Sequence, residues 1–205
     1  MKRFFFSFGA KLFIFVVLIG TCVLWLRVYW TRNIQDSTCQ SNLKLIALGM
    51  FEYAQDYEGK LPPVIFPGKT VGWADGLQPY LKSYGVFQCP VDTHPLQKTP
   101  QPNRPGFTDY WMNNNLSGLE AKGIAFPGEI IMLGDGDGGA SDSTASYAIG
   151  RLSGLWKHSS DLPTKRHHGG ANYAFLDGSV KWLKPEQIAQ VPPLEKSQFH
   201  TFLVK

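Results

Sequence analysis

The chain has 205 residues, 43% of them hydrophobic and 18% charged, with 21 glycines and 14 prolines. This length fits one domain with an appendage, and the composition excludes both a disordered chain and a helix bundle. The formal charge is +4, but residues 1–32 hold five basic and no acidic side chains. The remaining 173 residues carry 15 basic and 16 acidic side chains. Because a nucleic-acid binder needs a basic surface, we expect no nucleic-acid partner.

The N-terminal segment is strongly apolar. Leu12 to Leu26 is free of charge, and apolar or aromatic residues extend it to residues 4–30. A helix of that length spans about 40 Å, enough to cross a bilayer. The run ends in bulky residues instead of the small residues of a signal-peptide cleavage site, which favours a retained anchor. Of the five basic residues in this segment, three precede the run and two follow it. We therefore expect residues 1–32 to be a cytoplasmic stub with a transmembrane helix and 33–205 to be an extracytoplasmic domain.

The three cysteines fit export. Cys22 lies in the apolar run, whereas Cys39 and Cys89 lie in the body without the spacing of a zinc site. In an oxidising compartment we expect Cys39 and Cys89 to form a disulfide, which contributes roughly 4 kcal/mol in the chain-entropy model. The alternative is a pair of unrelated buried thiols.

A long helix is predicted over residues 33–58. Its apolar residues recur at intervals of three and four: Leu43, Ile46, Ala47, Met50, Ala54 and Tyr57. The helix either starts afresh at Asp36 or Ser37 or continues from the membrane, and it should stop near Gly59. Its apolar face needs a sheet or bundle to cover it.

The rest of the chain predicts short elements over residues 60–185 and a C-terminal tail over 186–205. Expected are a short helix within 72–84 interrupted by Pro79, an irregular proline-rich loop over 92–108, and a buried strand over 130–133 ended by a glycine-rich loop. Together these elements indicate an α+β fold, with a long N-terminal helix packed on an antiparallel sheet.

A hairpin is predicted around Asp177-Gly178. The runs 172–176 and 179–183 flank this pair, which is typical of a two-residue type I′ turn with positive φ at both positions. We expect this pairing to place Phe175 and Val180 on the buried face, with Trp182 beside Val180.

Two segments carry a resemblance to a known family. Residues 39–63, CQSNLKLIALGMFEYAQDYEGKLPP, resemble the helix-to-loop segment of bacterial type IV pilin-like proteins. His167 precedes Asp177-Gly178 by the spacing of the His-x9-Asp-Gly signature, which is similar to that of the prepilin-type processing-associated branch. Residues 72–81 and 87–92 are also similar to that family. The likeness extends from about residue 39 to residue 185.

The resemblance implies a pilin-like fold and a structural role. Its members are subunits, or relatives of subunits, of type IV pili or type II secretion pseudopilins. It therefore implies the bacterial cytoplasmic (inner) membrane as the location. The implied partners are the lipid bilayer, other pilin-like subunits and secretion or pilus assembly proteins.

The chain departs from the family at the processing site. Prepilins have Gly-Phe-Thr-Leu-Ile-Glu there, whereas Gly9 is followed by Lys11 and by Ile14 at the glutamate position. We therefore expect the peptidase not to cut after Gly9, which leaves a permanent anchor.

The motif residues allow a catalytic and a structural interpretation. His167 or His168 with Asp135, Asp137 or Asp177 and Ser179 would form a hydrolase-like set. The sequence has neither Gly-x-Ser-x-Gly nor His-Glu-x-x-His, so we expect no enzyme activity. In the structural interpretation, Asp177 and Gly178 form a turn, Gly169 and Gly170 allow a bend, and His167 or Asn172 satisfies backbone groups.

A calcium site is a further hypothesis. Asp135, Asp137 and Asp142 lie in a glycine-rich loop whose carboxylates and carbonyls are suitable calcium ligands, although the spacing is not that of an EF-hand. The alternative is a solvated acidic turn with no cofactor.

Two functions are compatible with the sequence. The first is a membrane-anchored pilin-like structural subunit. The second is a membrane-tethered binding module that offers the regions of Trp73, Trp111 and Trp156 to a glycan, a peptide or a protein partner.

Overall fold

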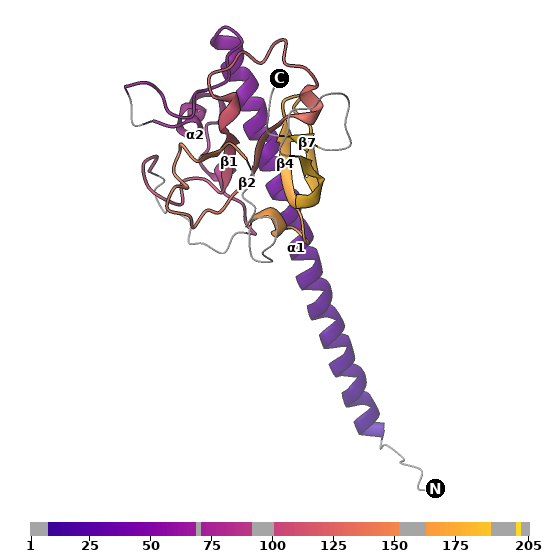
Figure 1. Cartoon of the computed structure of the whole chain (residues 1–205). Coiled ribbons are helices and arrows are strands. Elements are labelled where there is room, and N and C mark those ends of the chain that lie inside the picture. The colour runs from indigo at the N-terminus through magenta and orange to yellow at the C-terminus, as the bar shows by residue number, and fades with distance from the viewer. Residues whose placement is uncertain (1–7, 69–70, 92–100, 152–162, 190–199, 202–205) are drawn as a thin grey trace. The chain divides into compact units, whose positions relative to one another are not determined.

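The computed structural model describes residues 8–68, 71–91, 101–151, 163–189 and 200–201. The chain divides into two compact units, Met1–Gln35 and Asp36–Lys205. Helix α1 (Phe8–Asp56) is a single helix of 49 residues (Figure 1). The alternative of a fresh helix start at Asp36 or Ser37 is therefore wrong, because no helix-breaking proline interrupts this stretch.

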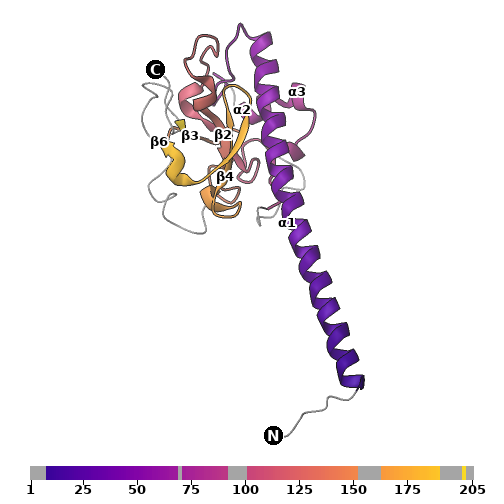
Figure 2. The ribbon, with the colours of Figure 1, turned by 90° about the vertical axis from the view of Figure 1, so that its right-hand side faces the viewer.

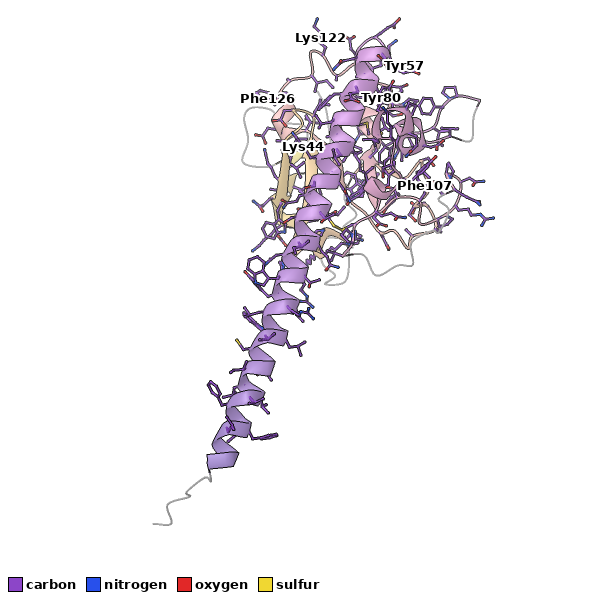
Figure 3. The ribbon with its side chains drawn as sticks, turned by 180° about the vertical axis from the view of Figure 1, so that it is seen from behind. Lys44, Tyr57, Tyr80, Phe107, Lys122 and Phe126 are labelled. Atoms are coloured by element: carbon purple, nitrogen blue, oxygen red, sulfur yellow. A yellow bond between two sulfur atoms is a disulfide. The ribbon has the colours of Figure 1, made fainter. Side chains whose placement is uncertain are left out.

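In the first unit, α1 exposes its apolar side chains. The large hydrophobic residues from Leu12 to Trp30 are all exposed, and Figure 3 shows side chains projecting from this part of the ribbon. This part of α1 is long and apolar enough to cross a membrane. By length and composition this helix is suited to a single membrane span.

In the second unit, α1 is a core helix. Leu43, Ile46 and Met50 are fully buried, which confirms the predicted spacing. The helix ends at Asp56, and Glu58 and Gly59 follow with φ of 56° and 79°, a left-handed ending close to the expected stop. Tyr57, expected on the buried face, is 50% exposed.

The second unit contains a five-stranded sheet in the order β3-β1-β2-β4-β5. The strands are β1 (Tyr110–Asn113), β2 (Ile131–Asp135), β3 (Ala148–Ile149), β4 (Ala171–Phe175) and β5 (Val180–Leu183). β1–β2, β2–β4 and β4–β5 are antiparallel, but β1 and β3 are parallel. The expectation of a purely antiparallel sheet is therefore wrong at this edge. The loop before β3 is fixed where the Tyr147 carbonyl accepts bonds from Trp73 Nε1 and from the Met112 amide, which aligns β3 with β1.

The short elements differ in detail from expectation. Helices α2 (Trp73–Gly76) and α3 (Gln78–Leu81) are separated at Leu77, because Pro79 lies in the first turn of α3, where proline is tolerated. The described residues also form the 3₁₀ turns η1 (Gly85–Phe87), η2 (Asn114–Leu116), η3 (Pro127–Glu129), η4 (Pro163–Lys165) and η5 (Pro185–Gln187). The predicted C-terminal tail instead contains η5 and a parallel pair, β6 (Ile188–Ala189) with β7 (His200–Thr201).

The sheet is covered on both faces. The later half of α1 passes along one face (Figure 2), where it forms a core with Met112, Leu133 and Ala174. A second cluster on the other face includes Tyr173 and Phe175. The larger members of this second cluster are Trp111, Ile131, Tyr147, Tyr173, Phe175, Leu183 and Ile188.

The predicted facing of the hairpin is partly wrong. β4 pairs Ala174 with Val180, so Val180 packs on the α1 side while Phe175 packs in the opposite cluster. A one-residue difference in register moves a side chain to the other face. Trp182 shares the face of Val180, as expected, but is 38% exposed.

The hairpin turn is not type I′. Gly178 has φ of 78°, but Asp177 is not among the residues with positive φ. The Gly178 amide donates to the Phe175 carbonyl at 2.8 Å, and the Phe175 amide donates to the Ser179 carbonyl at 2.9 Å. This is a three-residue loop in which a left-handed glycine follows the turn. Burial raises the pKa of Asp177, but hydrogen bonds from Ser179 and the charge of Lys181 outweigh it and hold the pKa below its ordinary value.

We predict that Gly178→Val lowers the free energy of unfolding by about 1–3 kcal/mol, because a β-branched residue is strained at positive φ. A Cβ there would also lie 3.0 Å from Phe51 Cε2. Urea denaturation of the full chain in detergent micelles measures the loss. Gly150→Val is the matched control, since a Cβ at Gly150 meets nothing closer than 4.0 Å. Equal midpoints for the two variants would contradict this account of the turn.

Candidate functional site

His167 is held in a tight turn, for which the sequence indicated a bend but not the turn type. His168 and Gly169 have φ of 55° and 83°, so both central residues of this turn are left-handed, as in a type I′ turn. The His167 amide donates to the Gly170 carbonyl at 2.9 Å, and the Gly170 amide donates back at 3.2 Å. Gly170 has no room for a side chain, because a Cβ would lie 2.5 Å from Trp182. The glycine pair was therefore correctly predicted to allow a bend.

The turn places the His167 ring between two carboxylates. Nδ1 lies 2.5 Å from Oδ1 of Asp36 on α1, and Nε2 lies 3.2 Å from Oδ2 of Asp135 at the end of β2. The side chain of His167 is 2% exposed, that of Asp135 is fully buried, and that of Asp36 is 21% exposed. His167 therefore joins the helix to the sheet, a larger role than the expected one of satisfying backbone groups.

Electrostatics favour the charged form of this histidine. Burial lowers the pKa of His167, but the hydrogen bonds and charges of Asp135 and Asp36 outweigh it, so the pKa is raised above 6.5. A protonated imidazole donates from both ring nitrogens, which matches a carboxylate on each side.

Asp135 is fixed by further polar contacts. Its Oδ2 accepts the Asn172 amide at 2.6 Å, and its carbonyl accepts Trp111 Nε1 at 2.7 Å. Burial and then the charge of Asp135 raise the pKa of the nearby Tyr173 hydroxyl. The same two causes come first in raising the pKa of Tyr110. The carboxylate is therefore a buried acid set among aromatic side chains.

The predicted disulfide is confirmed. Cys39 of α1 and Cys89 are bonded, with their Cα atoms 5.1 Å apart. Cys89 Sγ also lies 3.7 Å from His167 Nε2, so the disulfide and the ion pairs are in contact. The bond ties α1 to the segment that follows η1.

Asp36, Cys39 and Gln40 are three and four residues apart, so they form one stripe along α1. Asp36 pairs with His167, Cys39 bonds to Cys89, and Gln40 donates to Asn172 Oδ1 at 3.0 Å. We call these six residues the helix anchor. The side chain of His168 is 64% exposed, and its Nε2 lies 2.8 Å from Oδ2 of Asp36 on the solvent side of the helix anchor.

The hydrolase-like set does not assemble. His167 contacts Asp135, whereas Ser179 is bonded to Asp177 at the β4–β5 turn, with Oγ 2.6 Å from the carboxylate. Asp137 accepts the Gly139 amide in its own loop. The serine and the histidine therefore belong to separate pairs, and the absence of enzyme activity stays a prediction.

The three acids of the calcium hypothesis do not converge. Asp135 is engaged by His167 and Asn172, whereas Asp142 is exposed. Across the described parts of the chain, the only three His, Cys, Asp or Glu side chains with ligand atoms within 4.8 Å of one another are those of Cys39, Cys89 and His167.

Trp73 and Trp111 do not form the binding surface of the alternative function. Trp73 and Trp111 are fully buried, and each donates its Nε1–H to a backbone carbonyl; Trp156 lies outside the described residues. An aromatic cavity instead lies at the end of α1, with a volume of about 450 Å³. Tyr53 and Tyr57 line it with rings stacked 4.1 Å apart, near the end of α1 where Figure 3 labels Tyr57.

No family model matches the chain, and no curated protein or solved structure is significantly similar to it. The pilin-like assignment therefore stays a prediction from the sequence.

Proposed function

We propose that this protein is a membrane-anchored, pilin-like structural subunit of a bacterial envelope secretion or pilus-type apparatus. One observation carries the proposal. Within the single helix α1, the large apolar residues from Leu12 to Trp30 are exposed, whereas Leu43, Ile46 and Met50 are core residues. A protein that needs only a tether can use a flexible linker. A membrane helix that is also the central core element suits a subunit that assembles through that helix.

The helix anchor supports a role in which the protein transmits mechanical force. Burial of apolar area is non-directional, so by itself it resists sliding of a helix along a sheet only weakly. The Cys39–Cys89 bond and the Asp36–His167 pair hold α1 at fixed positions along its length. Such fixing suits a body through which force passes to a membrane helix.

The proposed location is the cytoplasmic (inner) membrane, with a single span and the body outside the cytoplasm. A disulfide forms and persists in an oxidising compartment outside the cytoplasm. The basic residues before the apolar run favour a cytoplasmic N-terminus. The partners proposed with it are the lipid bilayer, other pilin-like subunits and assembly proteins.

Cys22 provides a native probe of assembly. It is exposed on the apolar half of α1, and the other two cysteines are already bonded to each other. We predict that a membrane-permeant oxidant applied to native membranes yields dimers joined through Cys22, and that Cys22→Ser abolishes them. Monomers alone after oxidation would contradict assembly through the helix.

The membrane topology has a test of its own. Protease added to spheroplasts should digest the body and spare the N-terminal fragment. A body protected from the protease would contradict the topology.

The cavity near Tyr53 and Tyr57 favours one second candidate, a membrane-tethered binding module for a glycan, peptide or protein. Tyr57, half exposed and stacked on the buried Tyr53, offers a flat apolar surface beside the carboxylate of Asp56. Exchanging residues 8–32 for an unrelated anchor separates the two functions. A structural subunit loses function after the exchange, whereas a binding module keeps it.

A further inference from the structure

We propose that the reduced form of Cys39 and Cys89, together with His167, is a binding site for a thiophilic divalent cation, with Zn²⁺ as the best fit. This inference goes beyond the structural role and does not depend on it. The disulfide-bonded form has no thiolate to offer, so the site exists only after reduction.

The three ligand atoms already converge. The two Sγ atoms and a ring nitrogen of His167 lie within 4.8 Å of one another, and all three residues are buried. They come from three parts of the second unit: α1, the segment after η1, and the turn before β4. Two thiolates and an imidazole are ligands typical of a tetrahedral zinc site.

Two distances match the edges of such a site. With Zn–S near 2.3 Å and Zn–N near 2.0–2.1 Å, a tetrahedral ion separates sulfur from nitrogen by about 3.6 Å and nitrogen from a carboxylate oxygen by about 3.3 Å. Cys89 Sγ lies 3.7 Å from His167 Nε2, and Asp135 Oδ2 lies 3.2 Å from the same nitrogen. Asp135 is thus placed beside the fourth position, and its buried Oδ1 has no hydrogen-bond partner among the described residues.

Asp36 supplies the outer contact that such histidines need. A metal-binding histidine usually donates its other ring N–H to a carboxylate, which fixes the ring and its tautomer. Asp36 Oδ1 lies 2.5 Å from His167 Nδ1 and can accept the N–H that stays on the ring when Nε2 gives up its proton to the incoming ion. The freed lone pair of Nε2 then lies beside Cys89 Sγ.

The chemistry balances with a dithiol as the reductant. The dithiol gives two electrons and two protons, the Cys39–Cys89 bond breaks to two thiols, and the dithiol becomes a disulfide. Zinc then displaces one proton from each thiol and the Nε2 proton of His167 as the two thiolates and the imidazole bind it. Reoxidation by a disulfide-class oxidant takes two electrons from the thiolates, remakes the Cys39–Cys89 bond and releases the ion.

The test uses the full chain in micelles with Cys22→Ser, so that only the two body cysteines respond. The protein is reduced with a dithiol, freed of it without air, and titrated with Zn²⁺ against a chromophoric chelator. Co²⁺ serves as a spectroscopic probe for thiolate ligation. We expect one ion per reduced chain, thiolate-to-cobalt absorption, and no binding by the oxidised chain.

Variants separate this site from adventitious thiol binding. His167→Ala should weaken Zn²⁺ binding at least 10-fold and Asp36→Asn about 10–100-fold. Asp142→Ala, at an exposed acid outside the helix anchor, should leave the affinity unchanged. Circular dichroism of each reduced variant reports whether it remains folded. Absence of binding by a folded reduced chain would overturn the proposal. The proposal would also be overturned if His167→Ala or Asp36→Asn left the affinity for Zn²⁺ unchanged, because zinc held by the thiols of an unfolded chain needs neither residue.

Discussion

Asp135→Ala is expected to lower the free energy of unfolding by about 3–5 kcal/mol, because it removes one partner from a buried ion pair. The change leaves His167 without its inner carboxylate and the Asn172 amide without its acceptor. Urea denaturation of the full chain in micelles, followed by tryptophan fluorescence, measures the loss. Asp142→Ala, the same change at an exposed acid of the adjoining loop, should stay within about 0.5 kcal/mol of the parent.

The same ion pairs predict a pH dependence. The folded-state pKa of His167 is raised above 6.5, so its contribution to stability is present below that pH and is lost as the pH rises through the folded-state pKa. The difference in unfolding free energy between the parent and His167→Gln should therefore narrow as the pH rises above 6.5. A difference that widens with pH, or an Asp135→Ala variant as stable as Asp142→Ala, would refute a charged His167.

The double variant Cys39→Ala/Cys89→Ala is expected to lose roughly 4 kcal/mol of unfolding free energy, as the chain-entropy model gives for a loop of this length. The bonded cysteines are 50 residues apart and both fully buried. Alanine at both positions avoids leaving a single reactive thiol.

The matched control for this variant is Cys22→Ser, which changes a free and exposed cysteine. Urea midpoints of the three chains, measured without reductant, decide the prediction. Equal midpoints for the double variant and the parent would show that the bond adds nothing to the packing of α1 against its neighbours.

The elements set by local patterns were predictable from the sequence. The spacing of Leu43, Ile46 and Met50 identified the core face of α1. Two cysteines in a body expected to lie in an oxidising compartment indicated the disulfide. The hairpin was placed correctly, but its turn was not. Asp-Gly is compatible with more than one turn type. The glycine has positive φ in a type I′ turn and in the observed turn alike, so the sign of φ at the aspartate separates them, and aspartate adopts either sign.

The candidate site was only half predictable. His167 and Asn172 stood out as motif residues, whereas Asp36 was considered only as a helix cap. Its role depends on a histidine 131 residues later in the chain, which no local pattern reveals. The available signal was its position three residues before Cys39, on the same stripe of α1.

The parallel direction of β3 could not be read from a local pattern. Trp73 and Trp111 are buried, as tryptophans ordinarily are, and their ring N–H groups donate to backbone carbonyls on distant segments. β3 has two residues, too few for a pattern of alternation, and it owes its direction to the bonded loop before it.

The order of the chain delays the completion of this core. α1 is synthesised first, but its buried face is covered by β4, which begins at Ala171 (indigo and yellow in Figure 1). At roughly 5–20 residues per second, a ribosome needs on the order of ten seconds to make the intervening chain. Until β1, β2 and β4 have all been made, Leu43, Ile46 and Met50 lack part of the sheet that covers them. A nascent chain of this protein therefore presents a partly uncovered apolar stripe on α1, which is the kind of surface that chaperones bind.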